Sequence, residues 1–202
     1  MESSEGIEKH LAFIGKIISL YTHEQKNHLA IINESAGLIS DMLEFSETPP
    51  SPGQLLDIIK SIDAQIKKSS EMAKYLNAFG HRMDTPLASF KVNDCVEEVL
   101  VLLHRLIAQK RITFSTIYAA GLPPITGNPS SLQLLVFMAI INVAHEGTHI
   151  LVKTLNANGS TIISITPGDV DAPVNFMESS GYFKPAHAVT KNGREINIII
   201  PV

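Results

Sequence analysis

Along residues 1–45, apolar positions recur at alternating steps of three and four, the spacing of a long helix with one buried stripe. Gln25, His28 and Ser35 are polar breaks in this stripe. The pattern predicts a single helix that ends near Phe45. The positions on the stripe are Ile7, Leu11, Ile14, Ile18, Tyr21, Gln25, His28, Ile32, Ser35, Ile39 and Met42.

A second helix is predicted after residues 46–53, which contain three prolines and read as a turn. Its apolar pattern fades near Gly80, and the two helices are expected to form an antiparallel hairpin. Because both stripes are wider than one partner helix covers, we expect two hairpins to pair as a four-helix bundle in a homodimer. The alternative is that the hairpin packs on its own C-terminal half. The second stripe consists of Leu55, Ile58, Ile59, Ile62, Ile66, Ala73 and Leu76.

The pattern changes after residues 84–86, where short alternating segments replace the long stripes. The predicted fold class is therefore α+β, with a helical hairpin over residues 1–84 and an α/β sandwich over 85–202 whose helices cover one face of a mixed sheet. Asn93 or Asp94 is expected to cap the first sandwich helix. Residues 167–194 are expected to be loops with one short helix. The predicted elements are strand 88–92, helix 93–107, strand 112–118, helix 128–144, and strands 149–155, 161–166 and 195–200.

The segment Thr22-His23-Glu24-Gln25-Lys26-Asn27-His28-Leu29 lies midway along the first helix. His23 falls off the apolar stripe, so its imidazole is expected to face solvent. Asn27 follows four residues later, about 40° round the helix. An exposed neutral imidazole near a carboxylate and an amide suits a nucleophile that accepts a phosphoryl group. The segment resembles the phospho-acceptor box of two-component histidine kinases, in which His-Glu-x-x-Asn is a common form.

Two further segments are similar to the same family. Residues 122–132 are similar to the strand exit and helix entry before the family's N box, and residues 138–144 are similar to the N box itself. The resemblance implies a dimerising, phospho-accepting hairpin followed by a histidine kinase or GHKL ATPase-like sandwich. Asn142 matches the asparagine that helps to hold magnesium at the nucleotide phosphates in the family, whereas Met138 replaces a second asparagine.

The nucleotide site departs from the family pattern. Thr166 stands where the Asp-x-Gly-x-Gly box has its aspartate, and the second glycine is absent after Gly168 and Asp169. Residues 171–194 contain no second glycine-rich box and are too short for a nucleotide lid. Because backbone amides of such loops form most of a phosphate cradle, we expect Asn142, Thr166, Gly168 and Asp169 to be a vestigial nucleotide site without ATP.

This combination resembles the monofunctional histidine phosphotransferases of two-component phosphorelays. It implies that His23 accepts phosphoryl groups of response-regulator receiver domains and transfers them, or that they are hydrolysed. Glu24 would favour the nucleophilic tautomer, Asn27 would orient water, and Lys26 would screen the phosphate charge. No cofactor is expected in this chain, because magnesium would be supplied at the receiver. Two alternatives stay open: an atypical kinase that autophosphorylates with ATP, and a non-enzymatic dimeric scaffold that regulates a kinase or response regulator.

Composition narrows the remaining classes of partner, cellular location and site. A net charge of -4 and a pI near 6.0 argue against a nucleic-acid partner. The only cysteine, Cys95, excludes an internal disulfide, and together with an acidic N-terminus this favours a cytoplasmic protein. The longest apolar run, 132–144, is shorter than a membrane span. His23 and His28 are five residues apart, whereas two zinc ligands on one helix face need a spacing of four, so no metal site is expected.

Overall fold

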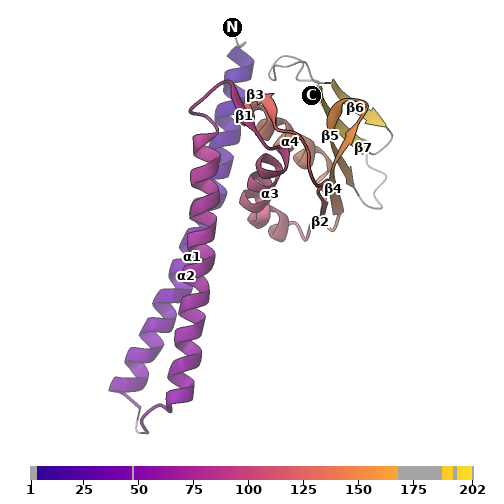
Figure 1. Ribbon diagram of the computed structural model, residues 1–202. Coiled ribbons are helices and arrows are strands. Elements are labelled where there is room, and N and C mark those ends of the chain that lie inside the picture. The colour runs from indigo at the N-terminus through magenta and orange to yellow at the C-terminus, as the bar shows by residue number, and fades with distance from the viewer. Residues whose placement is uncertain (1–3, 47, 168–187, 193–194, 202) are drawn as a thin grey trace.

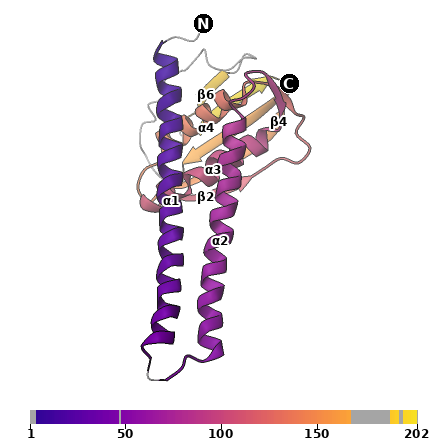
Figure 2. The same cartoon turned by 90° about the vertical axis from the view of Figure 1, so that its left-hand side faces the viewer.

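The computed structural model describes residues 4–46, 48–167, 188–192 and 195–201. Its N-terminal part is an antiparallel hairpin of α1 (Ser4–Glu44) and α2 (Pro52–His81), which lie side by side in both views (Figures 1 and 2). A capping box begins α2: the Ser51 hydroxyl accepts from the Gln54 amide at 3.3 Å, and the Gln54 side chain accepts from the Ser51 amide at 2.9 Å. Pro52 stands in the first turn, where its missing N–H costs no hydrogen bond.

The C-terminal part is an α/β sandwich built on a five-stranded mixed sheet of order β2-β4-β5-β7-β6. Only β2 and β4 are parallel, and the other neighbours are antiparallel. A separate antiparallel pair joins β1 to β3. The predicted α+β class, with helices followed by a mixed sheet, is confirmed (Figure 1). The elements are β1 (Ala88–Phe90), α3 (Val92–Gln109), β2 (Thr113–Ile117), β3 (Ile125–Gly127), α4 (Pro129–Val143), β4 (His149–Ala157), β5 (Ser160–Pro167), β6 (Ala188–Asn192) and β7 (Glu195–Pro201).

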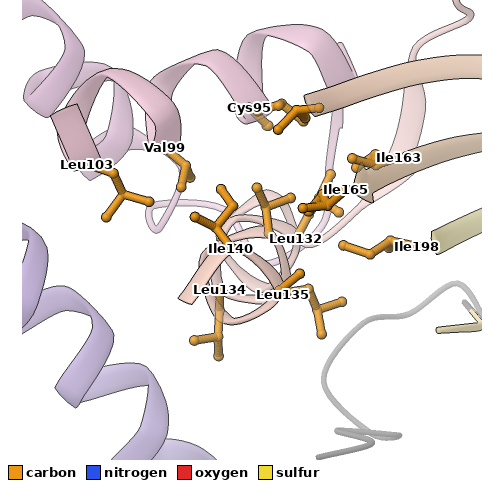
Figure 3. Packing of buried hydrophobic residues seen from close by; sticks show 14 of the residues in the cluster. Cys95, Val99, Leu103, Leu132, Leu134, Leu135, Ile140, Ile163, Ile165 and Ile198 are labelled. Atoms are coloured by element: carbon orange, nitrogen blue, oxygen red, sulfur yellow. The ribbon is translucent and has the colours of Figure 1, made fainter. Parts of the chain in front are cut away.

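The core of the sandwich lies between the sheet and helices α3 and α4. Figure 3 shows Leu132 and Ile140 of α4 between Val99 of α3 and the strand residues Ile165 and Ile198. Strand β5 explains this arrangement, because its odd-numbered residues 161–167 are buried and point to the helices, while its even-numbered residues belong to the opposite face. Helix α4 is apolar nearly all round and is correspondingly buried along most of its length.

The upper part of the hairpin belongs to the same hydrophobic cluster. Phe13 of α1 is 1% exposed, and its ring centroid lies 5.4 Å from that of Phe79 in α2 and 4.8 Å from that of Phe137 in α4. Ile17 and Leu20 of α1 are buried in this cluster as well. Along its upper part, the hairpin therefore packs on its own C-terminal half, as the alternative expected. The division near residue 84 stays a prediction, and the core is continuous across it.

The lower part of the hairpin extends beyond the sandwich (Figures 1 and 2). It carries exposed apolar side chains at intervals of seven residues: Ile31 and Leu38 of α1 with Phe45 directly after that helix, and Ile59 and Ile66 of α2. Heptad spacing is typical of a helix face that packs against further helices. The homodimer and its four-helix bundle stay predictions that this face favours.

Three local features differ from the predicted elements. Strand β3 was not expected, because three residues are too few to give a pattern, and β6 lies in a segment expected to be loops and one short helix. Helix α3 begins at Val92, so Asn93 and Asp94 do not cap it. Instead, the Asn93 amide donates to the Ala119 carbonyl at 3.1 Å and accepts from the Thr154 hydroxyl at 2.8 Å. The predicted absence of a nucleotide lid concerns residues 171–194, of which the structure describes only 188–192.

The turn between β4 and β5 agrees with its sequence. Asn158 and Gly159 both have positive φ values, 53° and 71°, as the type I′ turn of a two-residue hairpin requires. In the described part of the chain, no helix combines the length and the apolar content needed to cross a bilayer.

Candidate functional site

The predicted phospho-acceptor residues lie together near the middle of α1. His23 is exposed, as its position off the apolar stripe predicted. Glu24 is half-buried beside it, and the Asn27 amide nitrogen lies 3.5 Å from a Glu24 carboxylate oxygen, the outer limit of a hydrogen bond. Lys26 is exposed on the same stretch of helix. The helix therefore presents an imidazole, a carboxylate and an amide within about one turn.

A polar layer between the two helices lies directly behind this site. His28 is 7% exposed, and its Nδ1 lies 2.8 Å from the Gln65 side-chain oxygen of α2, so Nδ1 carries the hydrogen. The Gln25 amide donates to the Ser69 carbonyl at 3.1 Å and its oxygen accepts from the Ser69 hydroxyl. Two polar breaks in the apolar stripe are thus satisfied by partners on α2. Single polar residues in a helical seam fix its register, which sets the height of His23 along the hairpin.

Sequence reasoning missed Gln65 and Ser69, although a signal was present. Both are polar residues placed between apolar positions of the second stripe, seven residues after Ile58 and Ile62 respectively. They therefore fall on the seam itself, opposite the polar breaks of the first helix. His28 lies on the apolar stripe of the first helix in the sequence, and its burial agrees with that position.

A groove of about 830 Å³ begins at Glu24 and lies between the hairpin, α3 and β2. Burial, followed by the charges of Glu97 and Glu71, raises the pKa of Tyr75 close by. Burial, followed by Glu97, also raises the pKa of Tyr118, which lines the groove. Both phenols therefore stay protonated and neutral at neutral pH beside carboxylates. No sequence pattern predicted this groove, because α2, α3 and β2 come together only in the folded chain.

The two predicted vestigial nucleotide residues that the structure describes, Asn142 and Thr166, are not brought together. Asn142 is half-buried on α4, and its amide donates to the Met138 carbonyl of its own helix at 2.8 Å. Thr166 belongs to the even-numbered row of β5, on the sheet face opposite α4. Gly168 and Asp169 lie outside the described residues. Asn142 and Thr166 therefore occupy opposite faces of the sheet.

Two other reactive side chains of the described chain, Cys95 and His149, are held in structural surroundings. Burial raises the pKa of the Cys95 thiol to about 12, so it is protonated and inert near neutrality. His149, on the outer sheet face, lies between the hydroxyls of Thr113 at 2.8 Å and Ser115 at 3.0 Å. Within the described residues, no three His, Cys, Asp or Glu side chains are arranged to hold a metal ion.

Comparison with known proteins gives similarity to solved structures only. No family model matches the chain, and no curated protein matches it. A structure described as a bacterial phosphotransferase has a TM-score of 0.47 at 11% identity, over 98% of this chain and 97% of that chain. Histidine kinase ThkA in complex with response regulator protein TrrA has a TM-score of 0.46 at 14% identity, over 96% of this chain and 62% of that chain.

A third similar structure is the Acinetobacter baumannii histidine kinase AdeS, with a TM-score of 0.42 at 15% identity over 89% of this chain and 97% of that chain. All three TM-scores are below 0.5. The description of the site therefore rests on the geometry of His23, Glu24 and Asn27 and of the elements that hold them.

Proposed function

We propose that this chain is a two-component signalling protein that exchanges phosphoryl groups with receiver domains through His23. The observation that carries the proposal is an exposed His23 with Glu24 and Asn27 beside it, midway along a helical hairpin. An exposed histidine alone is an ordinary surface residue. The matching carboxylate and amide, and the polar layer that fixes their height on the hairpin, support the functional interpretation.

The chemistry requires a neutral imidazole. One ring nitrogen attacks the phosphorus of the receiver's acyl phosphate, a P–N bond forms, and the P–O bond to the aspartate breaks so that the aspartate leaves as a carboxylate. The hydrogen on the other ring nitrogen stays on the ring, where Glu24 stabilises the positive charge that develops. Transfer to a second receiver reverses these steps. Asn27 would orient a water for direct hydrolysis of the acyl phosphate, and magnesium comes with the receiver.

Two features favour this function over ATP-dependent autophosphorylation. The Asn142 amide is engaged with its own helix, and Thr166 is on the other face of the sheet. The sandwich is also held on the hairpin by a buried polar cluster. There, the Arg82 guanidinium at the end of α2 donates to both Glu98 oxygens of α3 at 2.8 and 3.1 Å, and Gln133 of α4 donates to Glu98 at 2.7 Å. Such packing suits a fixed docking surface better than a domain that swings onto His23.

The assembly that we propose for this protein is a homodimer. The lower hairpin has no described element against its exposed apolar residues, and these recur at the heptad spacing of a helical bundle. Pairing two hairpins would bury this face and leave two copies of His23 available on one stalk.

Phosphotransfer from purified receiver domains, phosphorylated with acetyl phosphate, tests the proposal. We expect acid-labile, base-stable label on this chain, and we expect His23→Ala to abolish it. His145→Ala is the matched control, because His145 is an exposed histidine in the loop after α4. Asn27→Ala is expected to keep transfer and to lose any phosphatase activity. The relay function is wrong if no phosphorylated receiver from the same organism labels the wild-type chain.

The kinase alternative has its own measurement. It requires saturable binding of ATP with magnesium and label on His23 from ATP, whereas the proposed phosphotransferase shows neither at millimolar nucleotide. The scaffold alternative predicts that His23→Ala keeps full signalling activity while changes on the exposed hairpin face lose it.

A further inference from the structure

Strand β2 leaves one edge of the sheet open. The Thr113 amide donates to the Thr148 carbonyl at 3.1 Å, and Thr113 pairs with His149 in the parallel register with β4. In a parallel pair, alternate residues direct both N–H and C=O to the neighbour, and the residues between them direct both groups the other way. Phe114 and Thr116 therefore point their backbone groups away from β4. No strand among the described residues lies on that side.

The open edge lacks the features that usually prevent pairing. Natural edge strands carry charged residues, proline or bulges that keep further strands away. Thr113–Ile117 contains no charged residue and no proline, and its register with β4 is continuous over all five residues. The edge at the other end of the sheet, β6, carries Lys191. The sequence of β2 is thus compatible with the addition of another strand.

The groove described above runs along this edge. Phe114, Thr116 and Tyr118 line one wall at the two-residue interval of a strand, and Met72 of α2 and Leu100 of α3 also line it. A chain segment that paired with β2 would direct alternate side chains into this partly apolar groove. The edge would supply main-chain hydrogen bonds, and the groove would supply side-chain contacts.

The groove is also acidic. Three carboxylates line it, from Glu24, Glu71 and Glu97, against one ammonium group, that of Lys68. His28, His104 and Tyr118 complete its titratable side chains. Burial is the main cause of the raised pKa values of Tyr75 and Tyr118, and the charge of Glu97 contributes to both, which agrees with a negative potential. Charge complementarity therefore favours an occupant with lysine or arginine side chains.

We infer that an extended segment of a partner protein, with alternating apolar side chains and at least one lysine or arginine, adds to the open edge of β2 as a further strand. This inference does not depend on phosphoryl transfer through His23. Because Glu24 lines the groove next to His23, the bound segment would hold its parent protein beside the candidate site. An unpaired edge and an acidic, apolar-lined groove meet at this one place in the described chain.

The probe is a capped extended peptide in which valine and one lysine occupy the alternate positions that face the groove, and threonine occupies the positions between them. Hydrogen exchange of individual backbone amides, followed by NMR, is measured with and without the peptide. The amides of Phe114 and Thr116 are expected to slow by about tenfold or more at saturation, while those of Thr113, Ser115 and Ile117 change little because they already bond to β4. A matched peptide with glutamate in place of lysine is expected to bind weakly, and one with a central proline is expected not to pair.

Two variants separate edge pairing from attraction between charges. Thr116→Pro removes an N–H that points away from β4, so the sheet is kept while the peptide loses a hydrogen-bond partner. Glu97→Lys is expected to weaken the lysine peptide and to strengthen the glutamate peptide. Glu146→Lys, in the exposed loop after α4, makes the same change of charge outside the groove and should alter neither. Circular dichroism checks that each variant is folded. If Thr116→Pro does not fold, Glu97→Lys still tests the inference.

Three results would overturn the inference. The first is unchanged exchange of the Phe114 and Thr116 amides at millimolar lysine peptide. The second is equal binding of the lysine and glutamate peptides. The third is slowing of the same two amides with rising protein concentration in the absence of peptide, because it would assign the edge to pairing with a second copy of this chain.

Discussion

Removal of the Phe13 ring tests whether the upper hairpin and the sandwich share one core. Phe13 is 1% exposed and contacts Phe79 of α2 and Phe137 of α4. Phe13→Ala removes a buried ring and leaves a cavity, which typically costs about 3–5 kcal/mol of unfolding free energy. The two ring contacts account for roughly 0.5–1.5 kcal/mol each. Because most of the ring's surroundings belong to a packed cluster, we expect a loss near the middle of the general range, about 4 kcal/mol.

The assay is urea unfolding followed separately by a helix signal and by a probe in the sandwich. Leu87→Ala is the control, because Leu87 is 64% exposed in the loop between α2 and β1, away from the hairpin face proposed to pair, and truncation there should cost less than about 0.5 kcal/mol. Phe13→Ala is expected to shift both probes together, since the ring joins both parts of the chain. The shared core is wrong if Phe13→Ala costs no more than Leu87→Ala, or if it moves the helix probe and leaves the sandwich probe unchanged.

Three further predictions follow from other parts of the structure. Leu38→Asp and Ile66→Asp should convert the proposed homodimer to a monomer in sedimentation experiments, and an unchanged dimer would place the interface elsewhere. Cys95 should not react with a thiol reagent at pH 8 until the protein unfolds. Its folded pKa of about 12 lies above the unfolded value, so the folded state keeps the thiol proton to higher pH than the unfolded state does. The free energy of unfolding should therefore fall from about pH 9 upward, and it should fall less in Cys95→Ala. Glu98→Leu leaves the Arg82 guanidinium without its buried partner and should cost about 3 kcal/mol in thermal or urea unfolding, and a neutral effect would show that the cluster is dispensable.

The sequence predicted the elements whose side chains repeat over many residues. The long stripes gave both helices with ends within a few residues of those observed, and alternation gave β4, β5 and β7. Strand β3 has three residues and pairs only with β1, so its sequence has no repeating apolar pattern that could predict it. Asn93 shows a second limit, because a cap residue and a buried hydrogen-bond partner look alike before the fold is known.

The features of the candidate site also divide into those that the sequence predicted and those that it did not. The exposure of His23 followed from its position on one helix, which local periodicity determines. The groove beside Glu24 and the separation of Asn142 from Thr166 depend on how helices and sheet pack, which no single segment encodes. His28 lies between these cases, since the seam positions of His28 and of Gln65 on the other helix were both readable, but the pairing of the two was not.

The polar layer behind His23 has a consequence for the size of a partner. Because Gln25 and His28 bond to residues of α2, α1 cannot slide along its neighbour without losing these bonds. The distance along α1 from His23 to the end of the helix at Glu44 is about 32 Å, since each residue rises by 1.5 Å. A folded domain of about 100 residues has a radius of gyration of about 13 Å, so its breadth is similar to this length. The lower hairpin is therefore tall enough for one such domain to rest along it, with one end at the tip and the other at the imidazole.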